Sequence, residues 1–222
     1  INAAGRMKAI FFDKTGTLTD NEMKLDPVII SQPQSNKLAM VEFALEAEVD
    51  MELSSEERAR ESLIMQNFAT NQTLTSLDGK VLGDPMEDEM FKFSGGQFGR
   101  EEEGKEVDGV KFVRQILFKP SQVHSHPPSL HVMHVFDFKS HLQRMSVLVQ
   151  DTHSKKNYVF TKGAPEKIMK QCRPESVPGD AQEEVKRLSK QGFRVLAFGM
   201  KEIADDFKEV ATAHLDTGQR RV

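Results

Sequence analysis

The chain has 222 residues, 38% of them hydrophobic and 29% charged, a composition typical of a globular chain with one large domain. Its formal net charge is −4, with basic and acidic residues interspersed, which argues against a nucleic-acid-binding protein. The single cysteine, Cys172, excludes a disulfide within the chain and favours a reducing compartment. No stretch approaches about eighteen uninterrupted apolar residues, so no membrane-spanning helix is predicted.

The most informative motif follows the first apolar run. Residues 9–12 read Ala-Ile-Phe-Phe, and we predict a short buried strand over Lys8–Phe12. The next seven residues, 13–19, read Asp-Lys-Thr-Gly-Thr-Leu-Thr. An aspartate after a strand, followed by glycine and threonines, suits a nucleophile that accepts a phosphoryl group beside Mg2+. The alternative is an Asx-type turn, and the length of the string favours the phosphoryl acceptor.

The next part of the chain is predicted to be mainly helical. Met23–Ser35 contains two prolines and is expected to be extended and then turn-like, as a hinge. Apolar residues at helical spacing predict a helix over Asn36–Glu48. Ser54 or Ser55 is the expected cap of a second helix that ends near Thr73.

An antiparallel sheet is predicted for the rest of the chain. A turn over Ser76–Lys80 and a short helix opened by Asp84 and Pro85 precede it, and Gly192 is expected to end the last helix. Helices packed on a meander of strands indicate the α+β class. The expected strands are Val110–Lys119, His131–Phe138, Arg144–Gln150, Asn157–Thr161 and Arg194–Met200, with Arg144–Gln150 and Asn157–Thr161 as a hairpin, and the expected helices are Ala164–Gln171 and Asp180–Gln191.

The string at residues 13–19 is the phosphorylation signature of the P-type ATPases, pumps that pass through an aspartyl-phosphate. Four further segments resemble the nucleotide-binding domain of that family, in the same order. The resemblance implies that Asp13 is the phosphorylated residue, that Asp13 and Thr15 bind Mg2+, and that ATP is the ligand. The four segments are Gly-Asp-Pro-Met-Glu at 83–87, the stretch 136–147, Lys-Gly-Ala-Pro-Glu at 162–166 and Gly-Phe-Arg-Val-Leu-Ala at 192–197.

Two residues are implied to recognise the adenine base. By resemblance, Glu87 contacts the amino group of adenine, although Asp84, Pro85 and Glu87 also fit a helix cap. Phe138 corresponds to the aromatic residue on which adenine stacks. The alternative for Phe138 is a core side chain at the end of a strand, the usual location of phenylalanine.

The remaining implied contacts involve basic residues and a glycine. Lys162 corresponds to the lysine of the adenine pocket, and Gly163 would let the backbone approach a ligand. Arg194 matches an arginine that contacts the nucleotide phosphates in the family. Many family members carry lysine where Gln143 stands, so we expect Arg144 to take over a phosphate contact. The alternative for Lys162 is an ordinary surface lysine, and the alternative for Arg194 is an exposed charge at a strand edge.

Further motifs indicate a branch of the family. The run Cys-Arg-Pro-Glu-Ser-Val-Pro at 172–178, together with residues 143–147 and 162–166, resembles the fifth class of P-type ATPases and, within it, the B branch of polyamine transporters. The resemblance implies the cytosolic face of an endolysosomal or other organelle membrane. It also implies polyamine as cargo, which no residue of the chain itself indicates.

The resemblance divides the chain into three parts. Residues 1–24 are expected to be a fragment of a Rossmann-like phosphorylation domain of the haloacid dehalogenase type. Residues 25–215 form the nucleotide-binding domain, and residues 216–222 begin the return to the phosphorylation domain. The later Thr-Gly-Asp and Gly-Asp-Gly-x-x-Asn-Asp segments of the family do not occur. We therefore expect a monomeric chain that binds ATP or ADP but is not phosphorylated without its partners, the remaining phosphorylation, actuator and transmembrane domains.

Two other classes remain open. A stand-alone haloacid-dehalogenase-type phosphatase would share the aspartyl nucleophile, but such enzymes typically carry a second aspartate where Thr15 stands. A non-enzymatic interaction or metal-binding module could use His124, His126, His131 and His134. Their spacing resembles that of metal ligands, but no cysteine or acidic partner is near them.

Overall fold

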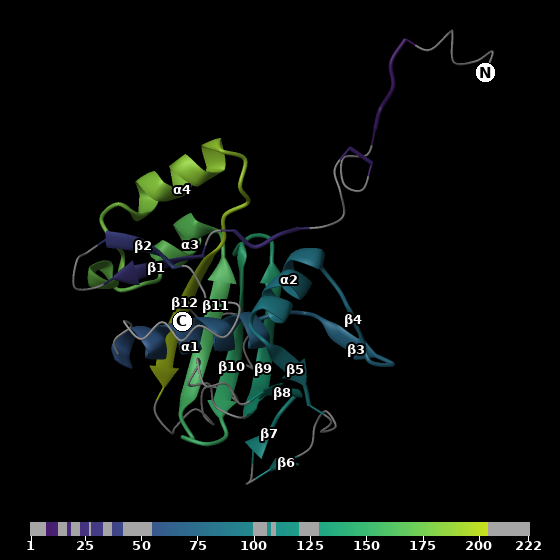
Figure 1. The fold of residues 1–222 in the computed structure, drawn as a ribbon, viewed down its shortest axis with the longest axis vertical. Coiled ribbons are helices and arrows are strands. Elements are labelled where there is room, and N and C mark those ends of the chain that lie inside the picture. Colours follow the sequence, from purple (N-terminus) through teal and green to yellow (C-terminus); the bar gives the residue numbers. More distant parts are fainter. Residues whose placement is uncertain are drawn as a thin grey trace, which may run out of the picture.

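A six-stranded antiparallel sheet forms the centre of the computed structural model, with the strand order β12-β11-β10-β9-β8-β5 (Figure 1). The structure describes residues 8–12, 17–18, 23–26, 28–32, 37–41, 55–99, 106–107, 110–119 and 129–203. Helices pack on this sheet, so the predicted α+β class is confirmed. The strands are β5 (Gly96–Phe98), β8 (Arg114–Phe118), β9 (Ser129–Lys139), β10 (Arg144–Asp151), β11 (Asn157–Gly163) and β12 (Ala197–Ile203).

The hairpin of β10 and β11 confirms the hairpin predicted from the sequence. Its register runs from the pair Arg144 and Gly163 to the pair Gln150 and Asn157. Successive side chains of a strand point to opposite faces of the sheet, so alternate residues of β10 enter the same core. Val147 and Val149 are fully buried there, as is Phe160 from β11.

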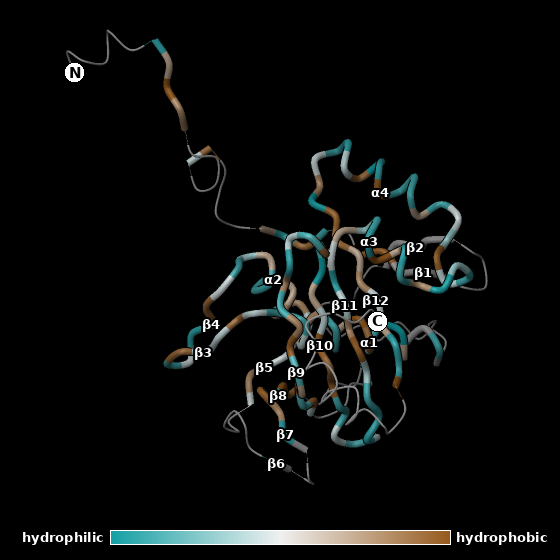
Figure 2. The backbone as a smooth tube through the Cα atoms, turned by 180° about the vertical axis from the view of Figure 1, so that it is seen from behind, coloured by the Kyte–Doolittle hydropathy of each residue, from teal (hydrophilic) through white to brown (hydrophobic). Residues whose placement is uncertain are grey.

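Two helices cover the apolar face of the sheet. They are α1 (Ser55–Thr70) and α2 (Pro85–Phe93), and both match helices predicted from the sequence. The ring of Phe68 on α1 meets that of Phe198 on β12 edge to face, with a centroid distance of 4.8 Å. In Figure 2 the hydrophobic colour runs along the strands of the central sheet. The main core joins Ala69, Leu74 and Phe91 from the helical side to Ile116, Phe118, Leu130, Val132, Val147, Val149, Tyr158 and Phe160 from the strands.

A second group of elements lies beside the β12 edge (Figure 1). It contains α3 (Pro165–Met169), the short 3-10 helix η2 (Pro174–Ser176) and α4 (Ala181–Lys190), and α4 is mainly hydrophilic in Figure 2. The expected end of α4 is confirmed. Gly192 has a φ of 92°, and the Phe193 N–H donates to the Leu188 carbonyl at 3.2 Å.

Three small hairpins complete the described residues: β1 (Val28–Gln32) with β2 (Lys37–Val41), β3 (Thr75–Leu77) with β4 (Lys80–Leu82), and β6 (Glu106–Val107) with β7 (Val110–Lys111). The predicted turn around Asp78 and Gly79 joins β3 to β4. The helix predicted over 36–48 is wrong for Lys37–Val41, which pairs with β1 along its whole length. Pairing with a neighbouring strand outweighs a helical pattern set by a few apolar residues. Residues 42–48 lie outside the described part.

The predicted buried strand over Lys8–Phe12 is also wrong. These residues form neither helix nor strand, and Phe11 is 95% exposed. No described strand pairs with them, and in Figure 1 they lie apart from the central sheet. Without a neighbouring strand in the described part of the chain, these residues have no partner there for backbone hydrogen bonds and no surface against which to bury their apolar side chains, so the side chains are exposed.

Two strand boundaries differ from the prediction. The strand expected at Arg194 begins at Ala197, because Ala197 pairs with Gly163, the last residue of the neighbouring β11. The strand expected over 110–119 is divided into β7 and β8, which belong to different sheets. Within the described residues, no helix is both long and apolar enough to cross a membrane.

Candidate functional site

The register of the central sheet brings the predicted binding residues to one end. Lys139 pairs with Arg144, Arg144 with Gly163, and Gly163 with Ala197, so the ends of four neighbouring strands lie side by side. Phe138 directly precedes Lys139 on β9. Arg194 lies three residues before Ala197, in the segment that enters β12. Residues far apart in the sequence therefore lie at one end of the sheet.

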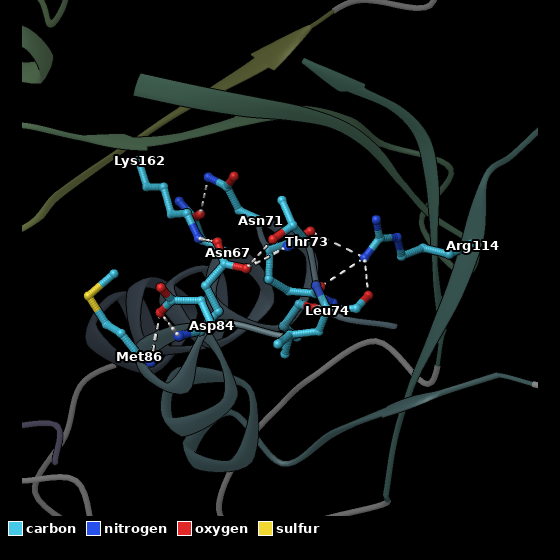
Figure 3. Close-up of polar contacts among 11 residues, drawn as sticks. Asn67, Asn71, Thr73, Leu74, Asp84, Met86, Arg114 and Lys162 are labelled. Carbon is cyan, nitrogen blue, oxygen red and sulfur yellow. Dashed lines mark hydrogen bonds and ion pairs between the residues drawn. The ribbon is translucent and has the colours of Figure 1, made fainter. Parts of the chain in front are cut away.

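A buried ion pair joins this end of the sheet to α2. The Lys162 Nζ lies 2.6 Å from the Glu87 Oε1, and the two side chains are only 7% and 8% exposed. Figure 3 shows the Lys162 side chain extending from the sheet toward Thr73 and Asp84. Lys162 comes from β11 and Glu87 from the first turn of α2. Ionised groups are rarely buried unless they are paired, and here each neutralises the other. The contact brings two of the predicted binding residues together, and their binding of adenine stays a prediction.

The second oxygen of Glu87 is held by Thr73. The Glu87 Oε2 accepts hydrogen bonds from the Thr73 N–H and from the Thr73 hydroxyl, each at 2.7 Å. A carboxylate oxygen can accept about two hydrogen bonds. The Oε2 is thus fully used, whereas the Oε1 accepts one hydrogen bond, from Lys162, and retains one lone pair.

These contacts determine the charges of the pair. Burial raises the pKa of Glu87, but the attraction and hydrogen bond of Lys162 and the two bonds from Thr73 outweigh it, so the pKa lies below its ordinary value. Burial is the main influence on Lys162 and lowers its pKa, while Glu87 acts in the opposite direction. Glu87 is therefore held as a carboxylate.

The start of α2 shows that its two interpretations are compatible. The Asp84 Oδ1 accepts from the backbone N–H groups of Met86 at 2.8 Å and Glu87 at 3.4 Å, which confirms Asp84 as the helix cap. The Glu87 side chain instead accepts hydrogen bonds from Lys162 and Thr73. Asp84 caps the helix while Glu87 remains available to the site.

Phe138 is an open aromatic side chain. It is 56% exposed at the end of β9, so the alternative of a core phenylalanine is wrong. Phe136, two residues earlier, is partly buried and packs against Leu148. The exposed ring lies at the same end of the sheet as the buried ion pair and is accessible to a ligand.

Gly163 has a packing reason for being glycine. A Cβ at this position would lie 2.3 Å from the Gln143 carbonyl oxygen and 2.8 Å from the Arg144 Cβ. The close approach lets the Ala164 N–H donate to the Gln143 carbonyl at 3.0 Å. Arg144 is half-buried and Arg194 is exposed. A direct approach of Gly163 to a ligand remains a prediction.

Other predicted residues cannot be placed in this site. Asp13 and Thr15, and with them the predicted phosphorylation and Mg2+ site, lie outside the described residues, as do His124 and His126. His131 is buried and stacks on Phe112 with a centroid distance of 4.2 Å. In the part of the chain that the structure describes, no group of three or more His, Cys, Asp or Glu side chains could hold a metal ion.

Sequence reasoning missed Thr73. It placed this residue only at the end of a helix, yet α1 ends at Thr70 and Thr73 meets the Glu87 carboxylate. The available signal was the polar run Thr70-Asn71-Gln72-Thr73 between the apolar Ala69 and Leu74. Asn71 and Gln72 are buried and need polar partners, whereas Thr73 is exposed and still meets the Glu87 carboxylate.

Comparison with known proteins identifies the family. The family model of the P-type ATPase cytoplasmic domain N matches residues 38–220. The chain belongs to the P-type ATPases. This assignment favours the pump domain over the stand-alone phosphatase and over the interaction module.

Individual relatives agree with the predicted branch. The chain is 31% identical to human "Probable cation-transporting ATPase 13A4" over 93% of its length and 16% of the relative's. It is 30% identical to human "Polyamine-transporting ATPase 13A3" over 91% of the chain and 17% of that protein. It is 29% identical to "Vacuolar cation-transporting ATPase YPK9" of Saccharomyces cerevisiae over 89% of the chain and 15% of that protein. These relatives are fifth-class ATPases of the 13A type, as the motifs predicted. The chain spans about one sixth of the length of the curated relatives it matches.

Proposed function

We propose that this chain binds ATP or ADP at the sheet end that holds Glu87, Lys162 and Phe138, as the nucleotide-binding domain of a P-type ATPase. The observation that carries the proposal is the buried pair of Glu87 on α2 and Lys162 on β11. The pair lies at the end of the sheet that also carries the exposed Phe138. A buried charged pair needs a reason, because apolar side chains of the same volume would often serve stability equally well. Recognition of a polar ligand supplies that reason.

The pair suits the edge of an adenine base. The Glu87 Oε1 keeps one lone pair that can accept from the amino group of adenine, and the Lys162 Nζ has two further N–H groups for a ring nitrogen. Phe138 offers a face for stacking, a contact that contributes roughly 1–3 kcal/mol per base in nucleic-acid systems. Arg144 and Arg194 place cations at the same end for the phosphates, for which the guanidinium fork is well shaped.

We further propose that the bound ATP serves phosphoryl transfer to Asp13 in the complete pump. The Asp13 carboxylate attacks the γ-phosphorus, the bond to the bridging oxygen breaks, and ADP leaves with that electron pair. Mg2+, held with the help of Asp13 and Thr15, would neutralise charge on the transferred group. The division at residues 1–24, 25–215 and 216–222 belongs to this proposal. So do the partner domains, the organelle membrane and a polyamine cargo, which the name of the 13A3 relative suggests.

Nucleotide titration tests the binding proposal. The 222-residue chain is titrated with ATP, ADP, AMP and GTP by calorimetry and by NMR. We expect saturable binding with a preference for adenine, and roughly 5- to 150-fold weaker binding after Phe138→Ala. Phe11→Ala is the matched control, because Phe11 is 95% exposed and belongs to no strand of the central sheet. A folded chain that does not bind millimolar ATP would contradict the proposal.

The same chain tests the phosphorylation proposal. Incubation with γ-labelled ATP and Mg2+ should leave Asp13 unlabelled, because the proposed transfer needs the remaining phosphorylation domain. Labelling of this chain at Asp13 would show that the transfer needs no other domain.

A further inference from the structure

The loop that follows α1 is built around Glu87. Within the described residues, Thr73 and Lys162 donate hydrogen bonds to the Glu87 carboxylate, and both donors of Thr73 reach the same oxygen, Oε2. Two donors on one oxygen fix the plane of the carboxylate as well as its position. The Oε1 is then directed to Lys162.

Arg114, on strand β8 of the central sheet, holds this loop. From β8, the Arg114 Nη1 donates to the Gln72 carbonyl at 3.2 Å, to the Gln72 Oε1 at 2.8 Å and to the Leu74 carbonyl at 3.4 Å. The Gln72 Oε1 also accepts from the Leu74 N–H at 2.7 Å. Gln72 and Leu74 are almost completely buried. The loop is thus anchored on both sides of Thr73, whose N–H and hydroxyl both donate to the Glu87 carboxylate.

We propose that Thr73 is the positioning residue of the base-recognition site, which sets the Glu87 carboxylate so that its Oε1 accepts the amino group of adenine and repels the carbonyl oxygen of guanine. Arg114 supports Thr73 by holding the loop. The inference rests on the proposed nucleotide binding and extends it to the origin of base selectivity. Thr73 touches Glu87 rather than the ligand, so its effect passes through Glu87.

The expected preference for adenine follows from the hydrogen bonds that each carboxylate oxygen of Glu87 can still accept. The Oε2 is filled by Thr73, so a ligand must use the Oε1 beside the ammonium of Lys162. Adenine presents its exocyclic donor there next to a ring acceptor. Guanine presents a carbonyl next to a ring donor, which places two acceptors opposite each other. If Glu87 can rotate, either base can find a partner, and the distinction is lost.

Four variants of the chain test the inference. Thr73→Val removes the hydroxyl at nearly constant shape, and Thr73→Ser restores it. Thr75→Val is the matched control, since Thr75 is exposed on β3. Arg114→Lys keeps the charge but loses the guanidinium fork, and it provides a second route should Thr73→Val fail to fold. Affinities for ATP and GTP are measured for each folded variant.

We expect Thr73→Val to weaken ATP binding about tenfold with little change for GTP, Arg114→Lys to act in the same direction, and the serine and control variants to behave like the original chain. A second measurement needs no nucleotide. In a 13C NMR titration of the carboxyl groups, Thr73→Val should raise the pKa of Glu87, because a hydrogen bond to the charged form is lost.

The outcomes are distinguishable. Tight ATP binding with unchanged selectivity in Thr73→Val and Arg114→Lys would overturn the inference and leave the proposed function intact. Absence of binding by the original chain to either nucleotide would overturn the proposed function and the inference with it. If Thr73→Val weakened ATP and GTP binding equally, Thr73 would support the structure of the site without contributing to base selectivity. That result would also overturn the inference.

Discussion

Replacement of Lys162 by methionine tests the energetics of the buried ion pair. The change keeps a long flexible side chain but removes the ammonium that lies 2.6 Å from the Glu87 Oε1. Glu87, whose side chain is 8% exposed in the original chain, then keeps only its hydrogen bonds from Thr73 among the described residues. A buried charge without its counter-ion is strongly unfavourable, so the free energy of unfolding should fall at neutral pH.

The size of the loss follows from the burial. Breaking a buried ion pair by removing one partner typically costs about 3–5 kcal/mol. A chain of this length loses about 2–4 °C of melting temperature per kcal/mol, so we expect a decrease on the order of 10 °C. The double variant Lys162→Met with Glu87→Gln should recover part of the loss. A neutral amide can still accept from Thr73 and leaves no charge behind.

The pH dependence has a definite sign. Glu87 has a lowered pKa in the folded chain, so its contribution to stability is complete above the unfolded pKa and is lost as the pH falls through the folded value. In Lys162→Met the main lowering influence is gone, and burial raises the pKa of Glu87. The variant can then protonate Glu87 at a higher pH, so its deficit relative to the original chain should shrink as the solution becomes acidic.

Urea unfolding between neutral and mildly acidic pH measures these effects. Lys156→Met is the matched control, because Lys156 forms an exposed ion pair with Glu202 at 3.0 Å, with side chains 53% and 49% exposed. Exposed pairs contribute little, so this variant should unfold almost like the original chain. If Lys162→Met proved no less stable than Lys156→Met at neutral pH, the reasoning from burial would be refuted.

Two further predictions concern the edge of the site. Gly163→Ala should lower the melting temperature measured by circular dichroism, because its Cβ would stand 2.3 Å from the Gln143 carbonyl oxygen and force the backbone apart; an unchanged value would show that β10 and β11 separate at no cost. Arg194→Gln should leave stability unchanged, since Arg194 is exposed, but weaken ATP binding about five- to tenfold. Calorimetry with ATP and adenosine checks the second prediction, and an equal loss for both ligands would contradict a phosphate contact.

Local signals in the sequence were sufficient for several elements. Asp84 followed by Pro85 specifies a helix start through a side-chain acceptor and a preset φ, and the structure has that cap. The turn at Asp78 and Gly79 and the helix end at Gly192 follow in the same way from backbone preferences. Each of these features depends only on residues that are close to it in the sequence, so the sequence is sufficient to predict it.

Features that depend on distant partners were predicted less well. The apolar run of Lys8–Phe12 has the composition of a buried strand, but a strand also needs a neighbour, and these residues are exposed. Lys37–Val41 became a strand because β1 pairs with it. Neither outcome is encoded in the segment itself, since strand pairing joins residues across loops.

The sequence by itself determined the family, the α+β class and Glu87, Phe138 and Lys162 as candidate site residues, because motifs of several residues carry that information locally. The tertiary structure alone decided how those residues meet. It joined Glu87 to Lys162 across 75 positions and brought Thr73 to the same carboxylate. It also left Phe138 open rather than in the core. The physical reason is that burial and the pairing of charges depend on which surfaces pack together, and packing is a property of the whole fold.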